Sequence, residues 1–290
     1  MVFVVEWTKI LGPRGYMATV DVYRITNELD DPTLDAVAVR LESRGKHPRF
    51  IAMMDEYLSA MRIDSAATVL DLGCGTGVVS RAIAKRKDFA GRVTGIDRSP
   101  YLIAAASRFA ADEGLADVVE FRSGDSQSLE LRPGAFDAVV AHTLISHVED
   151  QRAVIREIAR VAKRGGRVGI FDGDYASMTY GGSDDPGKAK AVDEAIINAL
   201  VTNPRVMREM PQLLQEADLV LDAAFGYVVA DIGKADFMAP GLQSMLKVLP
   251  RSGAMTESEA RTWVESMMRR SDQGIYFGAI NFYSYVATRR

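Results

Sequence analysis

Three closely spaced glycines are the residues of this sequence with the clearest chemical implication. Residues 69–77 read VLDLGCGTG, so Gly73, Gly75 and Gly77 fall between the expected end of a strand and the start of a helix. Glycines at such a junction let a ligand approach the backbone, because a side chain would occupy its space. Asp97 lies 20 residues beyond Gly77, where a carboxylate can accept hydrogen bonds from both hydroxyls of a ribose. The two features together predict a nucleoside site, although the glycines alone would also suit a tight turn without a ligand.

A dinucleotide site is the competing interpretation of this segment. The dinucleotide pattern has glycines at G-x-G-x-x-G spacing, and here the third glycine comes one residue early. Val78 stands where that pattern has glycine or alanine. Asp71, just before the loop, would repel a pyrophosphate but suits a cationic ligand. These departures favour a sulfonium nucleoside.

The segments VLDLGCGTG (69–77), GIDRS (95–99) and SGDS (123–126) resemble motifs of the class I S-adenosylmethionine-dependent methyltransferases. Within that family the sequence is most similar to the branch of ubiquinone/menaquinone-biosynthesis C-methyltransferases and natural-product methyltransferases. The resemblance covers roughly residues 40 to 175. It implies an α/β, Rossmann-like fold with a seven-stranded, mostly parallel sheet, an antiparallel last strand, an N-terminal helical segment and helical insertions that form a substrate lid. It also implies S-adenosyl-L-methionine as cofactor and S-adenosyl-L-homocysteine as product.

The resemblance further implies how the methionyl part of the cofactor is held. This part would be lined by the loop 73–77, that is, by Gly73, Cys74, Gly75, Thr76 and Gly77. Asp71 would lie near its ammonium group, and Ala141 and His142 stand where a backbone carbonyl of the family meets the same group. Arg49, which precedes the first motif, is the candidate partner of the methionyl carboxylate.

The later motifs would hold the adenosine. Asp97 would bind the ribose, and Arg98 would lie along the face of the adenine. Asp125 would accept a hydrogen bond from the adenine amino group, with Gly124 and the Ser126 backbone beside it. Arg98 and Arg49 can equally well be interpreted as ordinary solvated residues of the protein surface.

Two of the three histidines are candidate catalytic residues. Methyl transfer from a sulfonium is an in-line displacement with a good leaving group, so positioning and desolvation supply most of the catalysis and no universal base is needed. His142 and His147 follow the fourth expected strand, at the edge where ligands of open α/β sheets bind. Either can act as general base or orient the acceptor, and a structural histidine is the alternative. Asp172, Asp174 and Tyr175 are further candidates at this edge, unless they cap a loop.

The methyl acceptor is expected to be a small molecule. Residues 141–144 read AHTL where amine methyltransferases of nucleic-acid bases carry Asn/Asp-Pro-Pro-Tyr/Phe, and no Pro-Cys nucleophile for cytosine C5 chemistry is present. Eight of the 13 methionines follow residue 175. Phe225, Tyr227, Phe237 and Trp263 are interspersed with them. Such side chains suit an apolar or aromatic acceptor pocket, and the alternative is that they form the core of the added helices.

The sequence therefore predicts a methyltransferase of secondary metabolism that acts on carbon, oxygen or nitrogen of a small metabolite. The alternative is a family member that binds the cofactor without methylating, as a cyclase, a lyase or a binding module. Both functions use the same pocket residues, so the motifs do not distinguish them.

Apolar runs alternate with helical patterns through the middle of the chain. The expected strands are 68–72, 92–96, 118–122, 136–141 and 168–171, followed by 220–229 and 274–287, which have antiparallel character. The expected helices are 33–41, 48–61, 78–86, 101–113, 150–162, 189–201, 204–217, 234–249 and 257–270. Strands separated by such helices predict right-handed crossovers and a mostly parallel sheet.

This pattern divides the chain into four parts. They are an N-terminal helical extension or lid (1–62), the cofactor-binding core (63–175), a helical insertion (176–218), and the rest of the sheet with a second lid insertion (219–290).

Composition excludes several other classes of protein. A hydrophobic content of 48% is normal for a packed globular chain, and a net charge of −4 does not favour nucleic-acid binding. The single cysteine, Cys74, excludes an internal disulfide and a site built from several thiolates. No apolar run approaches the roughly 20 residues of a membrane helix, so we expect a cytoplasmic protein without a membrane span. The apolar strip 2–5 with Trp7 is a candidate contact between subunits of a homo-oligomer.

Overall fold

The computed structural model describes residues 21–182, 186–251 and 255–290. Within them, a sheet of seven strands has the order β3-β2-β1-β4-β5-β7-β6. The strands are β1 (Thr68–Leu72), β2 (Arg92–Asp97), β3 (Val119–Ser123), β4 (Phe136–His142), β5 (Ala162–Tyr180), β6 (Leu219–Gly233) and β7 (Tyr276–Arg289). The first five strands pair in parallel, and β7 is antiparallel to both of its neighbours. This arrangement confirms the predicted α/β fold with its antiparallel last strand.

The helices begin and end close to the expected positions. They are α1 (Asp31–Gly45), α2 (Pro48–Ala60), α3 (Val78–Ala84), α4 (Pro100–Asp112), α5 (Gln151–Val161), α6 (Pro186–Leu200), α7 (Val206–Glu216), α8 (Ala239–Arg251) and α9 (Glu257–Asp272), with short 3-10 turns η1 (Thr26–Glu28) and η2 (Ile145–His147). Ser99 caps α4 by accepting a hydrogen bond from the Leu102 N–H, with Pro100 in the first turn. The helix expected at 234–249 begins later, at Ala239, because the Asp231 carboxylate holds the preceding turn by accepting the N–H groups of Asp236 and Met238.

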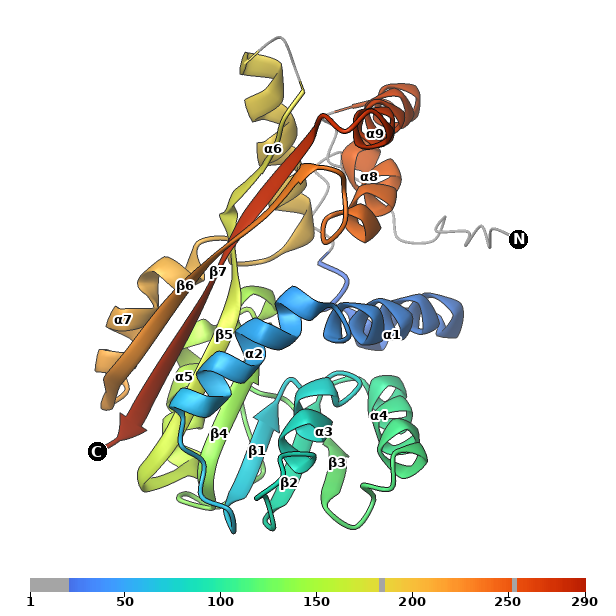
Figure 1. The fold of residues 1–290 in the computed structure, drawn as a ribbon. Helices are drawn as coiled ribbons and strands as arrows, with labels where there is room; N and C mark the ends of the chain where they lie inside the picture. The colour runs from blue at the N-terminus through green and yellow to red at the C-terminus, as the bar shows by residue number, and fades with distance from the viewer. Residues whose placement is uncertain (1–20, 183–185, 252–254) are drawn as a thin grey trace.

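Two apolar layers cover the sheet. One contains buried residues of α2 and α3 together with Val69 and Val140 of the strands, and the other contains α5 and α7 with Leu70 and Val139. Neighbouring residues of a strand thus face opposite layers, as the pleat requires. Figure 1 shows α2 on one side of the sheet and α5 and α7 on the other. Burial of both faces explains the continuous apolar runs of the central strands.

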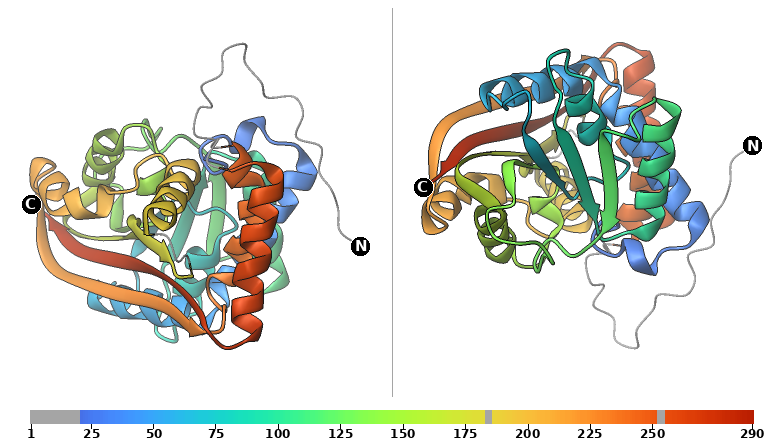
Figure 2. Two further views of the ribbon diagram at one scale, coloured as in Figure 1. Left: turned by 90° about the horizontal axis from the view of Figure 1, so that it is seen from above. Right: turned by 90° about the horizontal axis from the view of Figure 1, so that it is seen from below.

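Three long strands extend the sheet toward helices α6, α8 and α9. β5 was expected to end near Phe171 but continues to Tyr180, pairing with β7 across an irregularity between Asp174 and Thr179. The polar residues Asp172 and Asp174 therefore lie in a strand rather than a loop, and both are buried. Their carboxylates are satisfied there, by Ser146 and by Arg208 respectively. Seen from above, α6 and α9 cover this end of the molecule (Figure 2).

Among the described residues, no helix has the length and apolar character needed to cross a membrane. The candidate subunit contact at 2–5 and Trp7 lies outside the described residues.

Candidate functional site

The glycine loop after β1 adopts the backbone conformation that its sequence predicts. Gly73 and Gly75 have φ angles of 72° and 53°, in the left-handed region that favours glycine. The N–H groups of Gly73 and Cys74 donate to the Ile96 carbonyl, which fixes the loop against β2. A Cβ atom added to Gly75 would lie 3.0 Å from Leu41 Cδ1 of α1, so the loop and α1 face each other at close range.

Gly77 has a packing role. It precedes α3 with a φ of 77°, and an added Cβ would lie 2.5 Å from Phe121 Cζ of β3. Helix α3 can therefore approach the neighbouring strand only with glycine at this position.

Asp71 and Asp97 end neighbouring strands and are held by donors of the protein. Asp71 is 1% exposed, and its carboxylate accepts from the N–H and hydroxyl of Ser80 at 2.9 and 2.6 Å. Burial raises the pKa of Asp71 to about 6, so a cation beside it would favour its ionised form. Asp97 accepts from the N–H groups of Gly75 and Ser99, both at 2.9 Å, and burial raises its pKa. The Asp97 carboxylate thereby braces the glycine loop directly.

A cavity of about 350 Å³ lies between these strand ends and α1. The predicted site residues that line it are Asp71, Gly73, Cys74, Gly75, Thr76, Asp97, Arg98, Gly124, Asp125, Ser126, His142 and His147. The structure thus brings together the three motifs and both candidate catalytic histidines. Gly77 and Ala141 do not line the cavity, and Ala141 is fully buried in the sheet one residue before His142.

Arg49 also lies away from the cavity. Its guanidinium donates to the Ala230 carbonyl and to the buried carboxylate of Asp231, at 2.9 and 3.1 Å. Arg44 of α1 lines the cavity together with Arg24 and Arg98, and it donates to Thr143 Oγ1 at 2.9 Å. Thr143 itself has a φ of 53°, a strained conformation for a non-glycine residue that is typical of functional sites. The position of Arg49 therefore does not fit the expected contact with the methionyl carboxylate.

Unpartnered polar atoms gather around this cavity. Among the described residues, eight buried side-chain nitrogen and oxygen atoms lack a hydrogen-bond partner, and six belong to residues that line it. The six are Tyr23 Oη, Arg24 Nε, Thr26 Oγ1, Arg44 Nε, Thr76 Oγ1 and His142 Nε2. A buried polar atom without a partner costs roughly 1–3 kcal/mol. A polar ligand that contacts these atoms would recover this cost. The glycine loop leaves space for the part of such a ligand that lies against the backbone.

His142 is a buried, neutral imidazole. Its Nδ1 lies 2.8 Å from the Tyr57 hydroxyl, and its ring stacks on Phe171 at 4.4 Å between centroids. Burial holds the pKa of His142 well below its usual range and raises that of Tyr57. The Tyr57 hydroxyl finds its acceptor in Nδ1, so we assign the ring proton to Nε2, the atom without a partner. His142 therefore presents a donor.

His147 is oriented by a carboxylate that the sequence did not reveal. Its Nδ1 lies 2.9 Å from both oxygens of Asp21, a fully buried residue five positions before η1. The Asp21 Oδ2 atom also accepts from the N–H and hydroxyl of Thr202. A carboxylate on Nδ1 places the ring proton there and leaves Nε2 as an acceptor. This is the geometry of a general base with an orienting partner.

Comparison with known proteins agrees with the motifs. Residues 70–170 match a family described as a methyltransferase domain. Over 123 residues the chain is 37% identical to the sterol 24-C-methyltransferase erg6 of Aspergillus fumigatus, which corresponds to 42% of this chain and 32% of that protein. The chain thus spans about a third of the length of the sterol methyltransferases that it matches.

Solved structures of similar fold include methyltransferases and a cyclase. A geranyl diphosphate methyltransferase in complex with GPP and sinefungin is 18% identical with a TM-score of 0.53, covering 82% of this chain and 78% of that one. The 4+2 cyclase SpnF is 20% identical with a TM-score of 0.56, covering 84% of each chain. At this identity the likeness concerns the fold. The match to a methyltransferase domain thus lies in residues 70–170, the part of the chain that carries the three motifs.

The first expected result concerns Asp97. Asp97→Ala should weaken binding of S-adenosylhomocysteine by on the order of 2 kcal/mol, because the charge-assisted hydrogen bonds that we expect Asp97 to accept from the ribose would be lost. Calorimetry measures the affinity, and Asp117→Ala, a change in the loop before β3 and outside the cavity lining, is the control. Unchanged affinity in the Asp97 variant would remove this carboxylate from the site.

Proposed function

We propose that this protein is an S-adenosylmethionine-dependent methyltransferase whose acceptor is a small molecule. The observation that carries the proposal is the convergence, on one cavity, of the glycine loop, Asp97, the unpartnered polar atoms and His147. These groups offer what a nucleoside with a charged amino-acid tail requires, and a candidate base stands beside them.

The cavity residues divide between the two ends of the cofactor. Asp97 and Arg98 would hold the ribose and flank the adenine, and the segment 124–126 would contact the adenine edge. The glycine loop and Asp71 would face the methionyl end. Of the unpartnered donors of the cavity, which include Arg24 Nε, we place Arg44 Nε and His142 Nε2–H at the methionyl carboxylate. When bound, the cofactor supplies an electrophilic methyl group on a sulfonium.

His147 is the residue that would accept the proton of the acceptor. Its Nε2 is left as an acceptor by the Asp21 contact on Nδ1, and the Asp21 charge would stabilise the imidazolium once it forms. His142 has a different role, because its lowered pKa makes it a weak base. It positions the methionyl end through Nε2–H.

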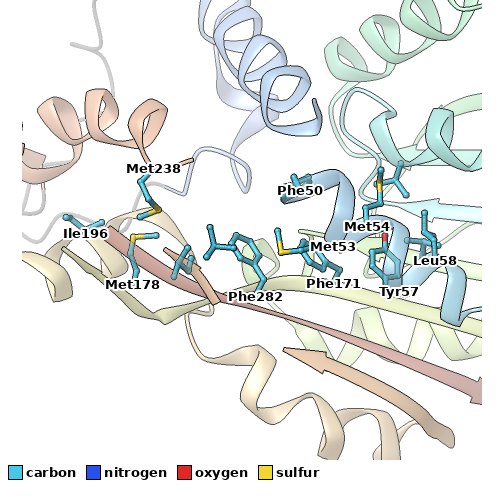
Figure 3. Close-up of a cluster of buried hydrophobic side chains, with 14 of the residues drawn as sticks. Phe50, Met53, Met54, Tyr57, Leu58, Phe171, Met178, Ile196, Met238 and Phe282 are labelled. Atoms are coloured by element: carbon cyan, nitrogen blue, oxygen red, sulfur yellow. The ribbon is translucent and has the colours of Figure 1, made fainter. Parts of the chain in front are cut away.

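Aromatic side chains cluster beside His142, and Phe50 of this cluster lines the cavity, which favours an apolar or aromatic acceptor. Phe171 stacks on Phe282 at 5.4 Å, and Phe50 lies edge-on to both rings. Phe237 stacks on Phe50 at 6.4 Å. Figure 3 shows Phe50, Phe171 and Phe282 in a continuous row of buried side chains that extends to Met178 and Met238. Phe171 and Phe282 are buried in the hydrophobic core behind Phe50 and do not line the cavity.

A cofactor-binding protein without methyl transfer is the second candidate, since a cyclase shares this fold. The two are separated by incubating the protein with methyl-labelled S-adenosylmethionine and a metabolite extract, with the Asp97→Ala variant as blank. A methyltransferase transfers label to a small molecule. The proposal of methyl transfer would be contradicted if the protein bound the cofactor but transferred no label to any metabolite, in extracts in which total metabolite is in excess.

A second expected result tests the proposed role of Arg44 at the methionyl carboxylate. Arg44→Gln should weaken S-adenosylhomocysteine about 10-fold and leave 5′-methylthioadenosine, which lacks the carboxylate, within about 2-fold. Arg49→Gln is the matched control and should leave both affinities unchanged, because Arg49 contacts Asp231 outside the cavity. The assignment would be wrong if Arg44→Gln weakened both ligands equally.

A further inference from the structure

The side chains of Tyr23 and His147 lie together in the lining of the cofactor cavity and have opposite hydrogen-bonding roles. Both residues line the cavity, and their rings lie 4.7 Å apart between centroids at an angle of 50°. Tyr23 Oη is buried without a hydrogen-bond partner among the described residues, so its O–H is a donor that lacks an acceptor. His147 Nε2 is an acceptor, because Asp21 holds the ring proton at Nδ1.

One buried carboxylate positions both residues. Asp21 Oδ1 accepts the backbone N–H of Tyr23 at 3.1 Å, and both Asp21 oxygens lie 2.9 Å from His147 Nδ1. Asp21 Oδ2 also accepts from the N–H and the hydroxyl of Thr202, both at 3.1 Å. The same side chain therefore fixes the imidazole and the backbone that carries the phenol ring.

The position of Tyr23 distinguishes it from the other unpartnered hydroxyls. Among the described residues, four buried hydroxyls have no hydrogen-bond partner, those of Tyr23, Thr26, Thr76 and Tyr276. Tyr276 does not line the cavity, and Thr76 belongs to the glycine loop at the cofactor end. Thr26 lies in η1, three residues beyond Tyr23. Tyr23 is the one of the four whose ring packs against the imidazole of His147.

A hydroxyl group on the acceptor matches this pair of side chains. Its O–H can donate to His147 Nε2 while one oxygen lone pair accepts from Tyr23, and the second lone pair remains free to attack the methyl group. The nitrogen of a neutral amine has one lone pair, and a hydrogen bond from Tyr23 would occupy the pair that must form the new bond. A carbon acceptor would leave the Tyr23 hydroxyl buried and unpaired, which is costly.

We infer that the methyl acceptor is an alcohol or phenol and that Tyr23 binds its reacting oxygen, an inference that rests on the proposed function. The O–H proton passes to His147 Nε2, and an oxygen lone pair forms the new O–C bond. The C–S bond of the sulfonium breaks, and its electron pair stays on sulfur, which becomes a neutral thioether. Negative charge develops on the oxygen as the proton leaves, so the hydrogen bond from Tyr23 is stronger in the transition state.

The first test identifies the atom that carries the transferred methyl group. The full chain is incubated with methyl-labelled S-adenosylmethionine and a metabolite extract, and the labelled products are heated with hydriodic acid. This reagent releases O-methyl groups as volatile methyl iodide, whereas C-methyl groups stay in the product and N-methyl groups need much stronger heating. We expect release of the label as methyl iodide. Label that stays in the product would overturn the inference, and absence of any transferred label would count against the proposed function instead.

The second test is Tyr23→Phe, which removes the hydroxyl and keeps the ring. Turnover in the same assay should fall about 10- to 100-fold, because a charge-assisted hydrogen bond is lost in the transition state. The affinity for S-adenosylhomocysteine should stay within about 2-fold by calorimetry. The unfolding temperature of the ligand-free protein should be equal or higher, because a buried unpaired polar atom is removed.

Tyr101→Phe is the matched control for this variant. It makes the same chemical change outside the cavity lining, where the hydroxyl donates to Asp35, and it should leave turnover unchanged. Three results for Tyr23→Phe would overturn its assignment. They are unchanged turnover, a loss of S-adenosylhomocysteine affinity as large as the loss of turnover, which would place the hydroxyl at the cofactor, and a lowered unfolding temperature, which would show a structural role.

Discussion

His147→Ala is expected to lower the turnover of methyl transfer by roughly 10²–10⁴-fold, the usual range for a positioned proton acceptor. The physical reason is the contact of its Nδ1 with both oxygens of Asp21, which leaves Nε2 to accept the proton. The affinity for S-adenosylhomocysteine should stay within a few-fold, because the loss is confined to the chemical step. Steady-state kinetics and calorimetry measure the two quantities separately.

Two companion variants sharpen this result. Asp21→Asn should reduce turnover in the same direction while the imidazole is retained, since the stabilising charge is lost. His142→Ala should change cofactor affinity and turnover together, because its unpartnered Nε2 belongs to the cofactor end of the cavity.

If His147→Ala keeps full turnover at every pH from about 6 to 9, no base acts at this position. The acceptor would then be a carbon or a neutral amine.

Gly75→Val should abolish cofactor binding while most of the fold remains. Two physical effects act together at this position. The φ of 53° is strained for a β-branched residue, and the first side-chain atom would already lie 3.0 Å from Leu41 Cδ1. The remaining methyl groups would occupy space between the loop and α1 that the ligand needs. Calorimetry with S-adenosylhomocysteine measures the loss, and circular dichroism measures the retained fold.

The matched control is Gly114→Val. Gly114 has a φ of 71° and nothing within 4 Å of an added Cβ, so this substitution introduces the same kind of backbone strain in open space. It should leave cofactor affinity unchanged. Binding that survives in Gly75→Val would mean that the loop is only a turn.

The cofactor end of the site was predictable because its residues form local motifs. The glycine loop, Asp97 and the segment 124–126 each follow a strand, and parallel strands bring their carboxyl ends to the same edge. A sequence motif therefore specifies both the residues and their place in the sheet. The same argument located His142 and His147 beside them.

The site residues that could not be predicted from the sequence lie on elements outside the motifs. No local sequence pattern specifies how these elements are rotated or how they pack against the sheet. Arg49 and Arg44 both precede the first motif, and only the packing of α1 and α2 decides which one faces the cavity. Asp21 meets His147 across 126 positions of the chain, a tertiary contact without a sequence signature. The extension of β5 was hidden by its polar residues Asp172 and Asp174, which tertiary partners satisfy.

Hydrogen–deuterium exchange with and without S-adenosylhomocysteine tests most directly whether the cavity beneath α1 is the cofactor site. The account predicts slower exchange of the amides in residues 73–77, 97–99 and 124–127, which line or brace this cavity. A second cavity of about 430 Å³ is lined by residues of α6 and α9 and provides an internal comparison. Protection at residues 258–267 of that cavity, with none at 73–77, would contradict the account.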